Sequence, residues 1–240
     1  ILPVSLYGQC AAMDRINEIA ATREIPVLED AAQSFGATYE GRHSCGLSQI
    51  GCTSFFPAKP LGAYGDAGAC FTPDSGLADR MREIRDHGQS GRYQHVRIGI
   101  NGRMDTLQAA VLHAKLDIFD DELQNRARAA ERYSSLLKAS EVAGKLQLPQ
   151  LQPHNFSSWA QFTIEVNDRN HVQTELAKKG IPTSVHYPIP VYEQPALDEA
   201  VAHCPNTERA AQRVLSLPMH PYLHPETQEF IAENLIEAIS

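Results

Sequence analysis

The sequence has 240 residues, with a formal net charge of −8, 42% hydrophobic residues and 21% charged residues. This length is enough to bury one large hydrophobic core or two smaller ones, and the composition is that of a soluble globular protein. The acidic balance argues against a nucleic-acid-binding surface, which is normally basic, and no apolar run approaches the roughly 20 residues that span a bilayer.

The cysteines are odd in number and include no Cys-x-x-Cys pair. They are Cys10, Cys45, Cys52, Cys70 and Cys204. This usage favours reduced thiols in a cytoplasm over a disulfide framework or a zinc site. We therefore expect a cytoplasmic protein that has no metal site and no nucleic-acid or membrane partner.

The first 30 residues predict a strand, a helix and a second strand. Residues 1–7 have the character of a strand from the interior of a domain, and residues 11–22 carry apolar side chains at helical spacing. A second apolar strand begins at Val27 and ends at Asp30. A strand–helix–strand unit of this kind implies that its two strands pair in parallel.

Asp30 has two interpretations at the carboxyl end of that strand. An acidic group there is costly unless a cation or hydrogen-bond donors lie nearby, and ligands of open α/β sheets bind at this end of the strands. A carboxylate in the same position is also a common N-cap, here for a helix or turn over residues 31–36. The residue by itself does not decide between a ligand site and a helix cap.

Lys59 follows the next predicted strand in an unusually rigid setting. The apolar run from Cys52 to Phe56 predicts a buried strand that Pro57 ends, and Lys59 lies between two prolines. A loop with glycines at positions 62, 65 and 68 follows. Proline fixes the backbone and glycine lets other groups come close, which suits a lysine that must reach one atom in a pocket. The alternative is an ordinary surface lysine, but Asp30, just past another strand, favours a paired site.

The next elements lead to a basic segment. Tyr39–Arg42 predicts a hairpin turn, Ala69–Thr72 a strand and Leu77–Asp86 a helix. The glycine-punctuated segment 87–103 then gathers positive and titratable side chains in an otherwise acidic chain, namely His87, Arg92, His95, Arg97 and Arg103. It is either a solvated loop or an anion site for phosphate or carboxylate groups.

The remaining elements predict a change of domain near residue 140. Apolar residues at helical spacing run from Met104 to about Ala139, and residues 141–158 have the composition of a linker. A smaller α+β domain is predicted beyond, with strands over residues 162–166 and 183–187, a helix over 172–179, a further segment from residue 215 and a last helix over 225–239. The expected domains are thus 1–140 and 141–240.

Two segments carry a resemblance to a known family. Glu-Asp-Ala-Ala-Gln-Ser-Phe-Gly-Ala at 29–37 and Ser-Phe-Phe-Pro-Ala-Lys-Pro-Leu-Gly-Ala-Tyr-Gly-Asp-Ala-Gly at 54–68 closely resemble the DegT/DnrJ/EryC1/StrS sugar aminotransferases. These are pyridoxal-phosphate enzymes of the aspartate-aminotransferase fold (fold type I), and the resemblance covers nearly the whole chain. It implies an α/β large domain over 1–140 and a smaller α+β domain over 141–240. Family members carry a further N-terminal segment with a phosphate-binding turn, so the large domain is expected to be N-terminally incomplete here.

The resemblance also implies roles for individual residues. Lys59 would carry pyridoxal 5'-phosphate and move the proton during transfer, and Asp30 would hold the pyridine nitrogen protonated. Ala31 and Gln33 would lie at the ring, and Ser54 would donate to the phosphate. Asn101 would bind the phosphate in the partner subunit, which implies a homodimer with shared active sites.

The implied substrate is a keto group of a UDP-linked sugar, a 3-keto uronic acid, with glutamate as the amino donor. Arg103 would face a substrate anion across the dimer, and His186 and Tyr187 would lie beside the sugar. Such amination belongs to the biosynthesis of surface polysaccharide or lipopolysaccharide, including O-antigen.

Other functions remain open at this point. Some relatives are dehydratases with histidine in place of the lysine, and Lys59 argues against that class. An inactive fragment that serves only as a dimerisation or scaffold piece is the main alternative. A dinucleotide-dependent dehydrogenase is disfavoured because the glycines at 62, 65 and 68 lack Gly-x-Gly-x-x-Gly spacing, and a hydrolase because no nucleophile elbow is present.

Overall fold

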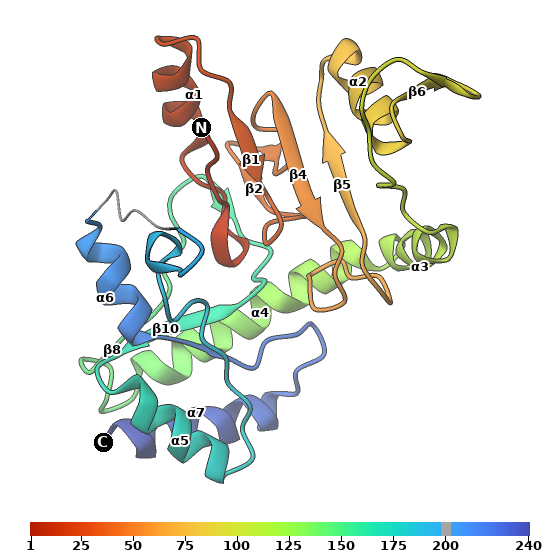
Figure 1. Cartoon of the computed structure of the whole chain (residues 1–240). Helices are drawn as coiled ribbons and strands as arrows, with labels where there is room; N and C mark the ends of the chain where they lie inside the picture. Colours follow the sequence, from red (N-terminus) through yellow and green to blue (C-terminus); the bar gives the residue numbers. More distant parts are fainter. Residues whose placement is uncertain (198–202) are drawn as a thin grey trace. The chain divides into compact units, whose positions relative to one another are not determined.

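The computed structural model describes residues 1–197 and 203–240, which divide into two compact units (Figure 1). The first unit consists of residues 1–123 and 151–160, and the second of residues 124–150 and 161–240. Helix α4 (Phe119–Lys138) begins in the first unit and continues in the second. The units therefore differ from the expected division at residue 140, because 151–160 return to the first unit before the chain enters the second again.

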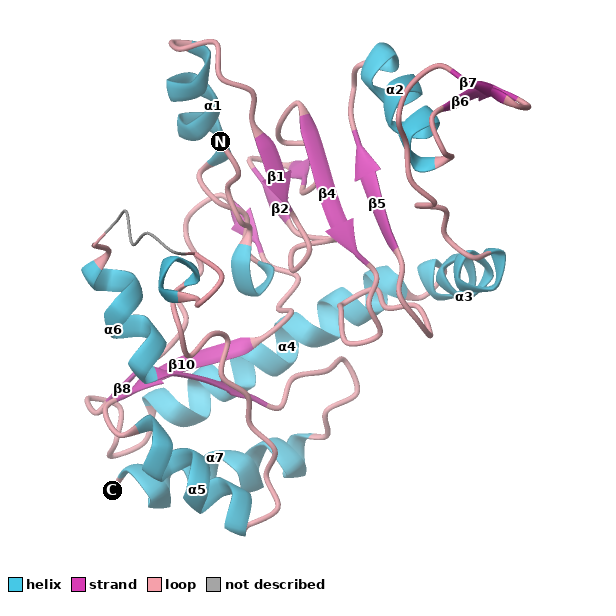
Figure 2. Cartoon of the chain, in the orientation of Figure 1, coloured by secondary structure: helices cyan, strands magenta, loops and turns pink. Residues whose placement is uncertain are grey.

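The first unit contains a three-stranded sheet in the order β1-β4-β5 (Figure 2). Its strands are β1 (Leu28–Asp30), β4 (Ile50–Ser54) and β5 (Gly68–Phe71); β1 and β4 run parallel, β4 and β5 antiparallel. The segment before β1 joins at Val4, which forms a parallel bridge with Asp30. The predicted parallel pairing is confirmed. The predicted strand over residues 1–7 is wrong beyond this bridge, since the short helix η1 (Leu6–Gly8) follows.

Helix α1 (Met13–Ala21) connects the first segment to β1, as predicted. Its buried residues Met13 and Ala20 pack with Val27 and Leu47 in one apolar cluster. The seven-residue spacing of Met13 and Ala20 puts both on the same face of the helix, which is why the apolar pattern predicted this element.

Shorter strands complete this side of the first unit. The predicted hairpin is present as β2 (Thr38–Tyr39) and β3 (Arg42–His43), and β2 also pairs with β9 (Asn155–Phe156). The linker expected over residues 141–158 therefore contains a strand that joins the first unit. Its pairing depends on a partner more than a hundred residues away, which no local pattern reveals.

The rest of the first unit lies beyond the edge strand β5 (Figure 1). Helix α2 (Ser75–Arg85) begins at Asp74, whose Oδ1 accepts a hydrogen bond from the Leu77 N–H at 2.9 Å. A hairpin of β6 (Gln89–Gly91) and β7 (Gln94–His95) follows, and then α3 (Thr106–Leu116). The helical region predicted from Met104 to Ala139 is thus two helices, α3 and α4.

The second unit packs helices with an antiparallel sheet in the order β11-β10-β8. Its strands are β8 (Leu146–Gln147), β10 (Phe162–Val166) and β11 (Val214–Leu217). Its helices, besides α4, are α5 (Arg169–Lys178), η2 (Val191–Glu193), α6 (Pro205–Arg213) and α7 (Pro225–Ile239). Tyr133 of α4 and Phe162 of β10 are fully buried, with ring centroids 5.1 Å apart, at the centre of the core.

One prediction for the second unit is wrong, and one helix was not predicted. Residues 183–187 do not form a strand: Ser184 makes a single antiparallel bridge with Ser216. Pro182 and Pro188 bracket this segment, and proline has no N–H to continue a ladder. Helix α6 was not predicted, because it is short and mostly polar, with alanine at its buried position, Ala211.

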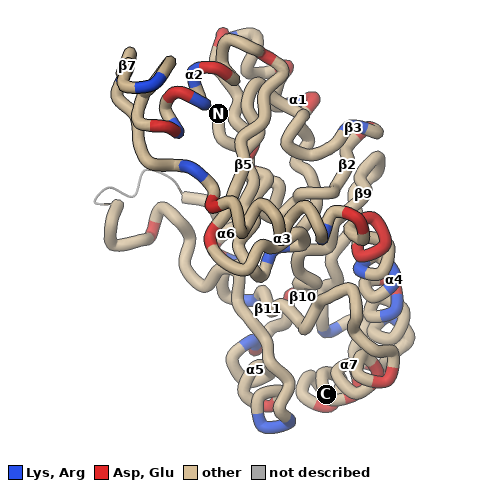
Figure 3. Tube along the Cα trace, turned by 90° about the vertical axis from the view of Figure 1, so that its right-hand side faces the viewer, with Lys and Arg blue, Asp and Glu red and all other residues tan. Residues whose placement is uncertain are grey.

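Charge is spread along the long helix α4. Figure 3 shows acidic residues at its start, which suit the positive end of a helix dipole, and basic residues further along. Of the helices within residues 1–197 and 203–240, none combines the length and the apolar character that crossing a membrane requires.

Glu29 is a fully buried carboxylate on the face of β1 opposite to Asp30. It accepts hydrogen bonds from Ser5 Oγ at 2.9 Å, Ser44 Oγ at 3.2 Å and the Cys45 N–H at 2.8 Å. Gly51, its partner on β4, makes this approach possible, since a Cβ there would lie 2.2 Å from the Cys45 carbonyl oxygen. These three hydrogen bonds compensate for the free-energy cost of removing the Glu29 carboxylate from water.

We predict that Glu29→Ala destabilises the fold by about 3 kcal/mol, because three buried donors lose their acceptor. Urea unfolding followed by circular dichroism measures this change. Glu18→Ala, at an exposed position of α1, is the control and should change the free energy of unfolding by less than about 0.5 kcal/mol. Equal effects of the two substitutions would contradict the assigned role of the network.

Candidate active site

Asp30 ends β1 and begins a tight turn. Its Oδ1 accepts a hydrogen bond from the Ala32 N–H at 3.0 Å. The Ala31 N–H donates to the Cys52 carbonyl at 2.7 Å, and Thr53 Oγ1 donates to the Ala31 carbonyl at 3.1 Å. Residues 32–36 form turns, one of the two structures expected after Asp30, and no helix follows it. The carboxylate caps a turn that β4 holds in place.

Gln33 lies buried in the same turn, with 5% of its surface exposed. Its side-chain Oε1 accepts a hydrogen bond from the Tyr7 N–H at 2.8 Å. Its main-chain carbonyl lies 3.4 Å from Ser158 Oγ, which donates to it. Hydrogen bonds from the start of the chain and from residues 151–160 therefore hold Gln33 in place. Both partners are distant in the sequence, so local patterns could not predict these contacts.

Lys59 lies in a turn that follows β4 directly. The Ser54 hydroxyl accepts a hydrogen bond from the Phe56 N–H at 3.2 Å, and the Lys59 N–H donates to the Phe56 carbonyl at 2.9 Å. Burial lowers the pKa of the Lys59 amine, and the charge of Asp30 acts in the opposite direction. The structure thus brings together the two residues that the sequence pattern paired, with burial favouring a neutral amine.

A glycine loop closes over the Lys59 turn. A Cβ at Gly62 would lie 2.4 Å from the Pro57 carbonyl oxygen, so no other residue allows this approach without moving the backbone. The Ala63 N–H donates to the Phe55 carbonyl at 2.8 Å. The loop after Lys59 is therefore folded back on the end of β4.

Two cysteines lie in a row with Asp30 across the sheet. Cys52 is opposite Asp30 on one side and opposite Cys70 on the other, and directly paired residues point to the same face. The two Sγ atoms are 3.6 Å apart, and burial, Cys70 and Asp30 raise the pKa of Cys52 to about 11. Ser54 is on this face too, two residues along β4. The sequence could not show this row, because the strand register was unknown.

Asn101 and Arg103 lie at the C-terminal end of α2. Asn101 forms an antiparallel bridge with Asp86, and the Arg103 guanidinium forms an ion pair with the Asp86 carboxylate. Arg97 pairs in the same way with Glu83. Two arginines of the segment that was expected to bind anions therefore already contact carboxylates of α2.

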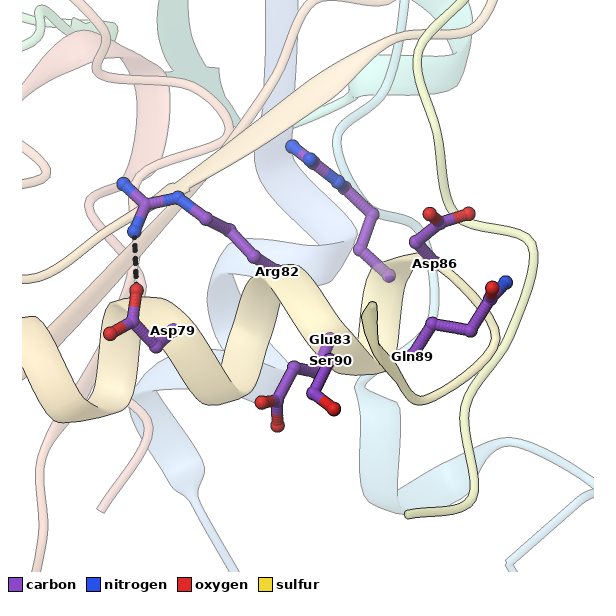
Figure 4. A pocket seen from close by; sticks show the side chains of 7 residues that line it. Asp79, Arg82, Glu83, Asp86, Gln89 and Ser90 are labelled. Atoms are coloured by element: carbon purple, nitrogen blue, oxygen red, sulfur yellow. Dashed lines mark hydrogen bonds and ion pairs between the residues drawn. The ribbon is translucent and has the colours of Figure 1, made fainter. Parts of the chain in front are cut away.

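A shallow hollow of about 440 Å³ opens on the same helix (Figure 4). Side chains of α2 and β6 line it, and Figure 4 shows the Asp79–Arg82 ion pair on its wall. Its lining mixes three acidic residues with two arginines and does not include Lys59 or Asp30. This balance of charge favours neither an anion nor a cation, so the hollow is not a candidate site.

His186 and Tyr187 lie in the second unit. His186 Nδ1 is 2.9 Å from Ser216 Oγ, which is 2.9 Å from Thr163 Oγ1. The His186 and Tyr187 rings meet edge to face with centroids 5.5 Å apart, and 56% of Tyr187 is exposed. His186 is thus fixed by two buried hydroxyls that the sequence did not single out, and Tyr187 is open to solvent.

The match to known proteins covers this whole arrangement. A sequence model of the DegT/DnrJ/EryC1/StrS aminotransferase family matches residues 1–236. The chain belongs to this family. It is 51% identical over 235 residues to the UDP-2-acetamido-2-deoxy-3-oxo-D-glucuronate aminotransferase of Pseudomonas aeruginosa, covering 98% of the chain and 64% of that relative. The chain thus spans about two thirds of the length of this relative.

Solved structures share the fold of this chain. A family aminotransferase from Brucella abortus has a TM-score of 0.94 and 40% identity, over 100% of this chain and 64% of that one. NtdA from Bacillus subtilis, solved with its bound cofactor PMP, has a TM-score of 0.90 and 32% identity, over 100% of this chain and 56% of that one. The expected α/β class and the fold of the family are confirmed.

We predict that Asp30→Asn lowers the pKa of the Lys59 amine further. The Asp30 charge stabilises the ammonium form and so raises this pKa, and its removal leaves burial to act alone. Competitive acetylation of the cofactor-free protein over a pH series, read by mass spectrometry, measures the change. Asp66→Asn, in the exposed part of the same loop, is the control and should leave the pKa unchanged; an unchanged value in Asp30→Asn as well would show that the two groups do not interact.

Proposed function

We propose that the intact protein is a pyridoxal-phosphate-dependent aminotransferase that transfers an amino group from glutamate to a keto group of a UDP-linked sugar. The observation that carries this proposal is Lys59. Its half-buried amine, of lowered pKa, lies in a rigid turn within electrostatic reach of Asp30, in a chain of an aminotransferase family. The relative from Pseudomonas aeruginosa supports a 3-keto uronic acid as the sugar.

The residues present fit this cofactor. NtdA holds its aminated form, PMP, and shares the fold. Asp30 uses Oδ1 for the Ala32 N–H, and a carboxylate has further lone pairs to accept a hydrogen bond from a protonated ring nitrogen. Ser54 has a hydroxyl on the same face of the sheet that could bind the phosphate, and Ala31 and Gln33 lie in the segment that follows Asp30.

The chemistry divides between the cofactor and the protein. When bound, pyridoxal phosphate supplies an aldehyde that condenses with amines and a ring that withdraws electrons from the reacting carbon. Lys59 would hold the cofactor and would move the proton at the carbon that carries the amine, for which its Nζ must be neutral. Because burial lowers the pKa of this amine, the neutral form is present at a lower pH than for a lysine in water. Asp30 would keep the ring nitrogen protonated.

Substrate recognition is assigned to three other residues. Arg103 would pair its guanidinium with a carboxylate or diphosphate of the sugar nucleotide. His186 and Tyr187 would contact the sugar, with His186 oriented by Ser216. In this proposal the first unit belongs to the cofactor-binding large domain, and the second unit is the smaller domain.

A homodimer with shared active sites would bring Asn101 and Arg103 of one subunit to the cofactor of the other. Both residues are exposed, and the segment around them also exposes several large apolar side chains. The large exposed side chains there are Tyr93, Val96, Ile98, Ile100 and Leu107, of which Ile98 is 96% exposed. Exposed apolar groups in such number are typical of an interface, and a second copy of the chain is the proposed occupant.

The cellular setting follows from the substrate. A UDP-linked amino uronic acid is a precursor of lipopolysaccharide or another surface polysaccharide, such as O-antigen, and its synthesis would take place in the cytoplasm. The free thiols of all five cysteines are in keeping with a reducing compartment.

We predict that Lys59→Ala abolishes amino transfer, with a loss of at least about a thousandfold, because it removes the amine that would hold the cofactor and move the proton. Borohydride reduction of the wild-type holoenzyme should fix the cofactor on Lys59, as peptide mass spectrometry would show. Lys178→Ala, on the exposed face of α5, is the control and should retain full activity. Measurable turnover by Lys59→Ala would refute the assignment.

We predict that two inactive variants complement each other in a hybrid dimer. Lys59→Ala and Asn101→Asp, when co-expressed, should recover about one quarter of the wild-type activity, because half of the dimers contain one intact site. Lys59→Ala with Asp30→Asn is the control and should recover none, since both residues come from one subunit. Activity no higher than that of the separate variants would contradict shared sites.

A further inference from the structure

One face of α3 contacts the loop that follows Lys59. Gln108, Leu112 and Lys115 are spaced by four and three residues, so they lie on the same side of the helix. Gln108 Oε1 accepts a hydrogen bond from the Tyr64 N–H at 2.8 Å, and Lys115 Nζ donates to the Gly62 carbonyl at 2.6 Å. The polar ends of this face thus bind the main chain of the loop.

Apolar contacts lie between these two hydrogen bonds. Leu112 is buried in one cluster with Leu61 and Ala63 of the loop, each of which is 1% exposed. The loop has no helix or strand of its own, and its backbone bonds lead to the end of β4 on one side and to α3 on the other. Helix α3 therefore supports this segment on the side away from β4.

The position of the loop is transmitted to Lys59 through Pro60. Proline fixes its own φ and restricts the residue before it, which here is Lys59 itself. Because Pro60 restricts rotation of the backbone between Lys59 and Leu61, a shift of Leu61 and Gly62 would move the Lys59 backbone as well. A misplacement of about 1 Å at a reacting group can lower a rate by about a hundredfold.

We propose that Gln108 and Lys115 are positioning residues that hold Lys59 in place through the loop at residues 61–64. This inference rests on the proposed function of Lys59. Neither side chain is offered as a contact of substrate or cofactor. The Tyr64 ring also lies near the Lys115 amine, whose Nζ is 6.0 Å from the ring centroid.

The test uses the intact holoenzyme and its cofactor-free form. Gln108→Leu removes the acceptor and Lys115→Met removes the donor, whereas Gln108→Glu and Lys115→Arg retain them. Lys145→Met is a matched control, because Lys145 Nζ also donates to a main-chain carbonyl, that of Ser240 at 2.8 Å, in the second unit. Three quantities are measured: kcat for amino transfer with KM for the donor, the pKa of the Lys59 amine by competitive acetylation, and the midpoint of urea unfolding.

We expect Gln108→Leu and Lys115→Met to lower kcat by about tenfold to a hundredfold with little change in KM. The pKa of Lys59 should rise toward its ordinary value in both, since a loosened loop admits water, and Asp30, the charge that acts on Lys59, is unchanged. The conservative variants should restore both quantities, and Lys145→Met should alter only the unfolding midpoint.

Two results overturn different parts of the argument. If kcat and the pKa of Lys59 in Gln108→Leu and Lys115→Met match those in Lys145→Met, the residues serve stability alone and the inference is wrong. If the wild-type protein binds no cofactor and transfers no amine, the proposed function fails. The acetylation measurement needs neither cofactor nor turnover, so it still decides whether α3 positions Lys59.

Discussion

The parallel pairing of β1 with β4 is the constraint on which the candidate site depends. Parallel strands end at the same edge of a sheet, and the register sets Asp30 opposite Cys52, two residues before β4 ends at Ser54. The turn after β1 and the turn after β4 therefore emerge side by side. This brings a carboxylate within electrostatic reach of an amine that is far away in the sequence. A backbone hydrogen bond ties the turn after β1 to β4, and others tie the segment after β4 to its own glycine loop.

The alternation of side chains along β1 separates two carboxylates with opposite tasks. Glu29 points away from Lys59 and is fully buried among three hydrogen-bond donors, where it joins the start of the chain to the loop at residues 44–45. Asp30 points to the other face, retains partial exposure and acts on a lysine. Adjacent residues of a strand point to opposite faces of the sheet. For this reason β1 contributes one carboxylate, Glu29, to the core and another, Asp30, to the candidate site.

Two opposing effects set the character of Lys59. Burial disfavours the ammonium form, and the nearby carboxylate favours it; burial is the larger effect, so the pKa falls. This balance depends on how closely the loop covers the amine. The contacts of that loop with β4 and α3 therefore affect the chemistry of the lysine.

The sequence by itself determined the family, helix α1 with a parallel connection around it, Asp30 and Lys59 as a pair of candidate site residues, and the last helix at residues 225–239. These features rest on local patterns: apolar periodicity, proline and glycine at fixed positions, and polar residues at strand ends. Only the tertiary structure decided that residues 155–156 pair with β2, that Cys52 and Cys70 lie in a row with Asp30, and that Gln108 and Lys115 bind the loop after Lys59. Strand register and long-range contacts join residues that are distant in the chain. Local sequence patterns do not show which distant strand or loop a residue will contact.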